Sequence, residues 1–136
     1  MKIMKKLFLY VLISTILLVS CGGKTTKKRN LDDTLYSYAS SIRWSHYDEA
    51  IAYLDPKEPN LKPRSFDIQK LKQYKVSSYS ESPIQPGSKE NIILQNVEIE
   101  LYNIHTNKSR TIYDQQSWRY DDELKQWFIT SGIPKL

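Results

Sequence analysis

The sequence predicts an α+β domain in which N-terminal helices pack on a curved antiparallel β-sheet meander. Leu31, Leu35, Tyr38 and Ile42 recur at spacings of three and four, which is typical of one apolar face of a helix. Residues 92–104 instead alternate apolar and charged side chains around their centre, which is typical of a strand with one buried face. Because the helical pattern fills the front of the chain and the strand pattern fills the rest, we expect the α+β class.

The helical half is expected to contain two main helices. Asn30 is the predicted N-cap of the first helix, which covers residues 31–42. The pattern restarts beyond Arg43, where Ser45 is the predicted N-cap of a second helix over residues 47–54.

A proline-rich connection is expected to follow these helices. The Asp55-Pro56 pair should end the second helix, because the residue before proline disfavours helical backbone angles. Residues 55–65 hold three prolines and predict an irregular connection, and residues 67–71 then predict a short helical turn.

The second half of the domain is expected to form strands. The candidate segments are rich in β-branched and aromatic residues and are separated by polar turns; they cover residues 74–79, 92–104, 110–120 and 124–130. The last three follow one another through the short turns 105–109 and 121–123, which predicts the antiparallel meander.

The first 20 residues have the organisation of a secretory signal peptide. Three lysines fall within the first six residues, an apolar stretch covers residues 7–18, and small residues precede Cys21. A transmembrane helix needs about 20 apolar residues, so this stretch is too short. A buried core helix is disfavoured by the lysines before the stretch and by the Cys-Gly-Gly sequence after it. An exported protein that is uncleaved or carries no lipid is the remaining alternative.

The end of this leader, Leu18-Val19-Ser20-Cys21, resembles the bacterial lipobox. The resemblance implies a diacylglycerol group on the Cys21 thiol, cleavage before Cys21 and acylation of the new N-terminus. The next residue is Gly22, not aspartate, which by the same resemblance implies the periplasmic face of the outer membrane in a two-membrane bacterium. Cys21 is the only cysteine, so no disulfide can form within the chain.

The positive charge of the chain lies around this cysteine. The whole chain carries +5, but without the leader it has 17 basic and 15 acidic residues, and residues 30–136 have 13 and 15. Nucleic acid is therefore not an expected partner. The basic run between residues 24 and 29 predicts a solvated tether; attraction to anionic lipid headgroups is the alternative. The expected organisation is a signal peptide (1–20), a lipidated cysteine with a flexible tether (21–30) and one domain (31–136).

The order of the elements resembles the nuclear transport factor 2-like fold, also called cystatin-like. The resemblance rests on a short helix at residues 44–50 after the first helix, and on a terminal hairpin with Trp118-Arg119-Tyr120-Asp121 and Trp127-Phe128. It implies a cone-shaped sheet packed on a helix, often with a pocket between them and often dimeric. It does not imply one function, because this family includes isomerases, dehydratases, binding modules and assembly factors.

No catalytic constellation is evident in the sequence. His46 and His105 are expected at the surface, and neither has a second ligand at metal-binding spacing. Asp114 shares strand parity with Ile112 and Trp118 and can face the core as a general base, but we favour pairing with Arg110 or Arg119, or exposure to solvent where the sheet twists. We expect no metal and no cofactor.

The aromatic residues are the other candidates for a site. They can line a pocket, form a protein-binding patch or fill the core, and we favour the core; the set is Trp44, Tyr47, Trp118, Tyr120 and Trp127. The sequence thus predicts a lipid-anchored, non-catalytic domain that binds an envelope protein or a second copy of itself through the open face of the sheet. The alternative is a small-molecule-binding or isomerase- or dehydratase-like domain that uses the cone cavity.

Overall fold

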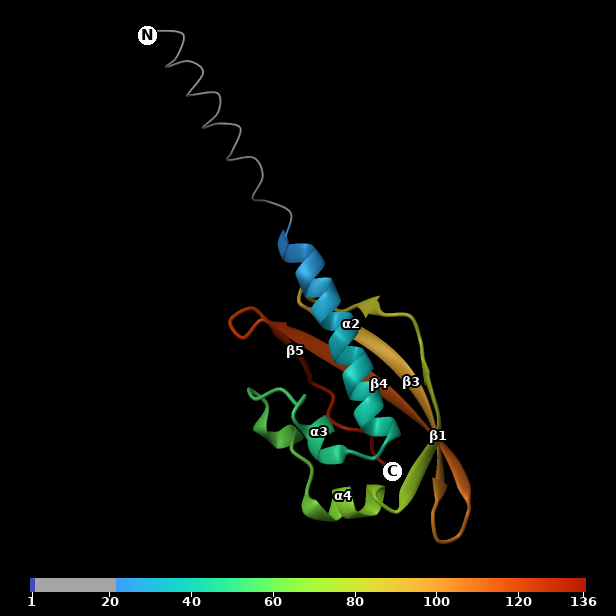
Figure 1. Ribbon diagram of the computed structural model, residues 1–136. Helices are drawn as coiled ribbons and strands as arrows, with labels where there is room; N and C mark the ends of the chain where they lie inside the picture. The colour runs from blue at the N-terminus through green and yellow to red at the C-terminus, as the bar shows by residue number, and fades with distance from the viewer. Residues whose placement is uncertain (2–21) are drawn as a thin grey trace.

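The computed structural model describes Met1 and residues 22–136, with side chains from Thr26 onward (Figure 1). Cys21 and residues 2–20 of the leader lie outside the described residues. The elements, in chain order, are α2 (Gly22–Arg43), α3 (Tyr47–Ile51), the 3-10 helix η1 (Pro59–Leu61), α4 (Ser65–Leu71), β1 (Tyr74–Glu81), β2 (Gln85–Pro86), β3 (Ile92–Asn103), β4 (Ser109–Asp121) and β5 (Gln126–Ile129). The predicted α+β class is confirmed.

The strands form a curled antiparallel sheet with α2 lying across one face (Figure 1). The order is β1-β3-β4-β5, with the two-residue β2 also paired to β3, so the predicted meander of the last three strands is confirmed. A parallel bridge between Leu54 and Ile129 covers the outer edge of β5. This bridge ties the end of the helical half to the last strand.

The predicted apolar faces of helix and sheet form the core. Leu31, Leu35, Tyr38 and Ile42 of α2 are all buried. The β3 residues 97, 99 and 101 are buried as well, while Glu98 and Glu100 between them are exposed. Both periodicities therefore predicted the correct buried face.

The predicted start of the first helix is wrong, because α2 begins at Gly22 and residues 22–29 are helical. Tertiary contacts explain the extension. The Lys27 ammonium lies 4.4 Å from the centre of the Tyr120 ring and donates a hydrogen bond to Asn91. The Trp127 indole N–H donates to the Lys27 carbonyl at 3.2 Å. The segment expected to be a flexible tether is thus packed on the sheet from Lys27 onward.

Ser45 ends α2 and does not cap α3. Its φ of 61° is left-handed, its N–H donates to the Ile42 carbonyl at 3.1 Å, and the His46 N–H donates to the Ser41 carbonyl at 2.8 Å. These two bonds form a Schellman motif with Ser45 in the position that glycine usually takes. The predicted N-cap at Ser45 is therefore wrong, and α3 begins at Tyr47.

Replacing Ser45 with glycine is expected to stabilise the protein by about 1 kcal/mol. The left-handed conformation costs an L-residue roughly this much, whereas glycine adopts it freely. Urea unfolding of the two proteins measures the difference. Asn107, at φ 56° in the β3–β4 turn, is the matched control, since asparagine tolerates this conformation. A gain at Asn107→Gly equal to that at Ser45→Gly would contradict the explanation.

The connection between the helices and the sheet follows the prediction in outline. Residues 55–64 are irregular apart from η1, and α4, which begins at Ser65, contains the predicted helical turn. At the start of α4, Arg64 donates two hydrogen bonds to Asp67, at 2.9 and 3.1 Å. This pair lowers the pKa of Asp67 and lies on the exposed surface.

Candidate functional site

The structure divides the predicted aromatic set into a buried group and one exposed residue. Tyr47, Trp118, Tyr120 and Trp127 are all buried, and Trp118 is fully inaccessible to solvent. Trp44, which follows the last residue of α2, is 70 % exposed. The set therefore does not come together as one site.

Aromatic rings contact one another between α2 and the sheet. Tyr38 of α2 meets Trp118 edge-to-face, with ring centres 5.0 Å apart, and meets Tyr53 in the same geometry at 5.8 Å. Tyr120 and Trp127 pack against each other at 5.2 Å. Such rings bury large apolar areas and prefer edge-to-face packing, so these residues serve as core.

Asp114 lies on the core side of β4 and is half-buried, which its strand parity allowed but which was not the favoured prediction. The Gln116 side-chain amide donates to its carboxylate at 2.9 Å and to the Tyr79 hydroxyl at 3.1 Å. The Trp118 indole N–H donates to the Gln116 oxygen at 3.2 Å. Burial raises the pKa of Asp114, and the hydrogen bond from Gln116 partly opposes this shift. The expected pairing with Arg110 or Arg119 is wrong, because Arg119 binds other carboxylates and Arg110 forms no ion pair among the described residues.

Substituting Asp114 with asparagine is expected to stabilise the folded state at neutral pH by about 0.5 kcal/mol or more. The folded-state pKa is above the unfolded value, so the contribution of Asp114 to stability is full below the unfolded pKa and is lost as pH rises through the folded pKa. Asparagine keeps a side-chain oxygen that accepts the hydrogen bond from Gln116. Because asparagine does not ionise, the variant does not lose stability as the pH rises. Urea unfolding at pH 3 and pH 7, about one unit below and three above the ordinary pKa of an aspartate, measures both effects. A wild-type protein more stable than the variant at neutral pH would contradict the assignment.

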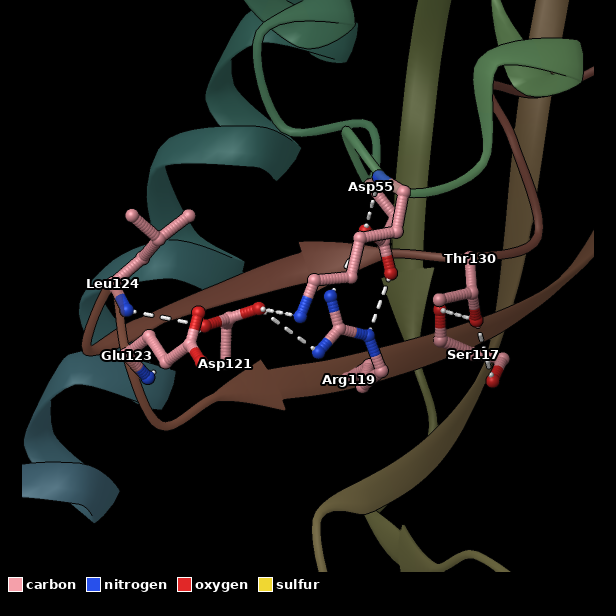
Figure 2. Close-up of polar contacts among 8 residues, drawn as sticks. Asp55, Ser117, Arg119, Asp121, Glu123, Leu124 and Thr130 are labelled. Carbon is pink, nitrogen blue, oxygen red and sulfur yellow. Dashed lines mark hydrogen bonds and ion pairs between the residues drawn. The ribbon is translucent and has the colours of Figure 1, made fainter.

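The most extensive polar contacts surround Arg119 of β4 (Figure 2). Its guanidinium donates to the two oxygens of Asp55 at 2.6 and 2.9 Å, and to Asp121 at 3.1 Å. Lys57 also binds Asp121, at 2.8 Å. Asp55 and Asp121 are almost fully buried, while Arg119 is about one-quarter exposed. The cluster fastens the connection after α3 to the β4–β5 hairpin.

The charges of this cluster are mutually compensated. The hydrogen bonds from Arg119 lower the pKa of Asp55. The pKa of Asp121 is lowered mainly by its hydrogen bond from Lys57 and next by the one from the Leu124 backbone N–H. The hydrogen bonds to Asp55 and Asp121 raise the pKa of Arg119. No carboxylate in it is free to act as a base near neutral pH, so we assign the cluster a structural role.

The surface of the described residues is hollowed in two places, among others, that Asp114 does not line. One is a groove of about 460 Å³ between residues 60–71 and residues 131–136. The second, of about 440 Å³, is lined by Trp127 and Phe128 together with residues of α2 and α3. The groove has no counterpart among the sites predicted from the sequence.

The histidines lie at the surface. His46 precedes α3 and its imidazole lies 3.5 Å from Glu49, with both side chains largely exposed, and His105 is in the exposed β3–β4 turn. Within the part of the chain that the structure describes, no three His, Cys, Asp or Glu side chains gather as a metal-ligand set.

Several large side chains other than Trp44 are also exposed. Tyr36 lies two helical turns before Trp44 on α2, about 12 Å along the helix axis, and Phe66 lies in α4. Tyr113 is 76 % exposed on the face of the sheet opposite to α2, directly across from Glu98.

Comparisons of the chain with protein-family models, curated protein sequences and solved structures gave no match.

Proposed function

We propose that this protein is a lipid-anchored bacterial envelope protein whose domain binds another protein and performs no catalysis. The observation that carries the proposal is the exposure of Trp44 at the end of α2, while the other aromatic candidates are packed in the core. Exposed tryptophan and tyrosine are enriched in the hot spots of protein interfaces. The ring contacts of Tyr38 with Tyr53 and Trp118, which occupy space between α2 and the sheet, support this proposal over the cone-cavity alternative.

The anchor in this proposal is diacylglycerol on Cys21, on the periplasmic face of the outer membrane. Its support is the leader and the lipobox-like sequence Leu18-Val19-Ser20-Cys21. Among the described residues, no helix combines the length and the hydrophobicity needed to cross a membrane. Since α2 begins at Gly22, helical structure starts one residue after the proposed anchor.

We further propose that the domain is a cone of the nuclear transport factor 2-like, or cystatin-like, type. The order of helices followed by a curled antiparallel sheet supports this assignment. Dimerisation, which such folds often show, is the competing form of association, with a second copy in place of a different partner.

The partner is proposed to bind at the end of the domain that carries Trp44. The open face of the sheet, where the sequence led us to expect the partner, is mainly polar around Tyr113, with Glu98 and Glu100 beside it. Large apolar side chains are better anchors than exposed carboxylates, because their burial supplies free energy without leaving an unpaired charge. The α2 end therefore fits a partner better than the sheet face does.

Replacing Trp44 with alanine is expected to reduce the recovery of crosslinked partner about thirtyfold while changing stability by no more than about 0.5 kcal/mol. The experiment is crosslinking in intact cells, followed by purification of the lipidated protein from membranes and quantitative mass spectrometry. Tyr113→Ala is the matched control, because this aromatic is similarly exposed, on the face of the sheet opposite to α2. If no protein is recovered reproducibly, the binding function is refuted. If recovery of the partner falls with Tyr113→Ala and not with Trp44→Ala, the interface lies on the sheet face instead.

A further inference from the structure

The groove between α4 and the C-terminal segment has an apolar floor and a basic rim. It is lined by residues 60–64, by Asp67, Lys70 and Leu71 of α4, and by residues 131–136. Leu71, Ile133 and Pro134 are buried and supply apolar surface along it. A volume of about 460 Å³ is within the usual range for ligand sites.

The cations of the rim exceed the carboxylates available to them. Arg64 is occupied by Asp67 through two hydrogen bonds, and Lys135 acts on the same carboxylate only at longer range. Lys62, Lys70 and Lys135 line the same groove, and none of them lies within 4 Å of a carboxylate in the described part of the chain. Three ammonium groups without an ion pair make the groove complementary to an anionic ligand.

The backbone of the C-terminal segment points to a peptide as that ligand. Gly132, Ile133 and Pro134 are buried, yet within residues 22–136 no backbone group of residues 132–136 bonds to another backbone group. Buried peptide groups in proteins almost always have a hydrogen-bond partner. A chain lying along the groove offers donors and acceptors to this segment, whereas a small anion offers acceptors only.

We propose that the groove binds an acidic peptide segment of the partner protein, with apolar side chains on its floor and carboxylates on Lys62, Lys70 and Lys135. This inference rests on the proposed function and names the chemistry of the partner. Figure 1 shows α4 and the C-terminus at the end of α2 that is distant from Gly22. Because α2 is about 33 Å long, the groove lies at the end of the domain that is distant from the proposed anchor.

The test measures binding of a fluorescein-labelled hexapeptide of alternating leucine and glutamate to the full-length lipidated protein in detergent micelles. The peptide in which glutamine replaces glutamate is the ligand control. The variant Lys62→Gln/Lys70→Gln/Lys135→Gln removes the rim charges, and Lys75→Gln/Lys89→Gln/Lys108→Gln changes three exposed lysines elsewhere by the same net charge. Thermal unfolding of each variant confirms that it is folded.

Fluorescence anisotropy is expected to give a Kd on the order of 100 μM for the acidic peptide, weakened about tenfold by the groove substitutions and less than twofold by the control ones. The glutamine peptide should also bind about tenfold more weakly. Equal loss in both variants, no binding of the acidic peptide, or its displacement by inorganic phosphate at matched ionic strength would overturn the proposal. If the groove variant still recovers the crosslinked partner in full, the groove inference fails while the binding function stands.

Discussion

Replacing Cys21 with serine is expected to abolish lipid labelling of the protein completely and to leave the 20-residue leader attached. The thiol is the atom proposed to carry diacylglycerol, and a serine hydroxyl is a far weaker nucleophile at neutral pH than a cysteine thiol. The measurement is metabolic labelling with an alkyne fatty acid, followed by gel electrophoresis, which resolves the precursor from the mature form.

Ser20→Ala is the matched control for this variant. It changes the neighbouring residue, keeps a small side chain before the cleavage site and leaves the thiol in place. Its labelling and its gel mobility should equal those of the wild type. Undiminished labelling of the Cys21→Ser protein would exclude this residue as the lipid site, and with it the anchor in the proposed function.

Replacing Arg119 with leucine is expected to destabilise the folded domain by about 3 to 5 kcal/mol. Leucine fills part of the space but removes the two hydrogen bonds from Arg119 to the buried Asp55, which keeps only the one from the Lys57 backbone N–H, and removes one bond to Asp121 (Figure 2). An unpaired buried carboxylate costs more than the pair itself contributes, because its desolvation is no longer compensated. Urea unfolding at neutral pH measures the loss.

The pH dependence of this loss distinguishes the ion cluster from simple packing. In the wild type the folded pKa of Asp55 is lowered, so its contribution is full above the unfolded pKa and is lost as pH falls through the folded pKa. The difference between wild type and variant should therefore shrink below about pH 4. Arg110→Leu, at an exposed position of the same strand, should change stability by no more than about 0.5 kcal/mol. A variant with the same deficit at acidic and neutral pH would contradict the electrostatic explanation.

The fold was largely predictable where local pattern and burial agree. The stripe from Leu31 to Ile42 and the alternation around Ile99 each identified the correct buried face, because the core lies on one side of both elements. The antiparallel order of the last three strands was predicted from the short turns at residues 105–109 and 121–123. The errors lie at helix ends: Lys27 packs on Tyr120 across the domain, and Ser45 occupies a position where sequence rules expect glycine.

The candidate sites were less predictable, because they depend on contacts between distant segments. Arg119 binds Asp55, 64 residues away, and nothing local to Asp55-Pro56 indicates a buried carboxylate. The groove likewise joins residues 60–71 to residues 131–136, and its lysines show no pattern along the chain. Trp44 lies just beyond the helical periodicity, so its exposure could not be predicted from the stripe that ends at Ile42.

The mass of the mature N-terminal peptide, from protein purified out of the membrane fraction, tests the central claim most directly. The proposed function predicts that the chain begins at Cys21 and carries a diacylglycerol thioether on it, with α2 starting at the next residue. A chain that begins at Met1, or one with a free Cys21 thiol, would contradict the claim that this domain is held at a membrane by lipid.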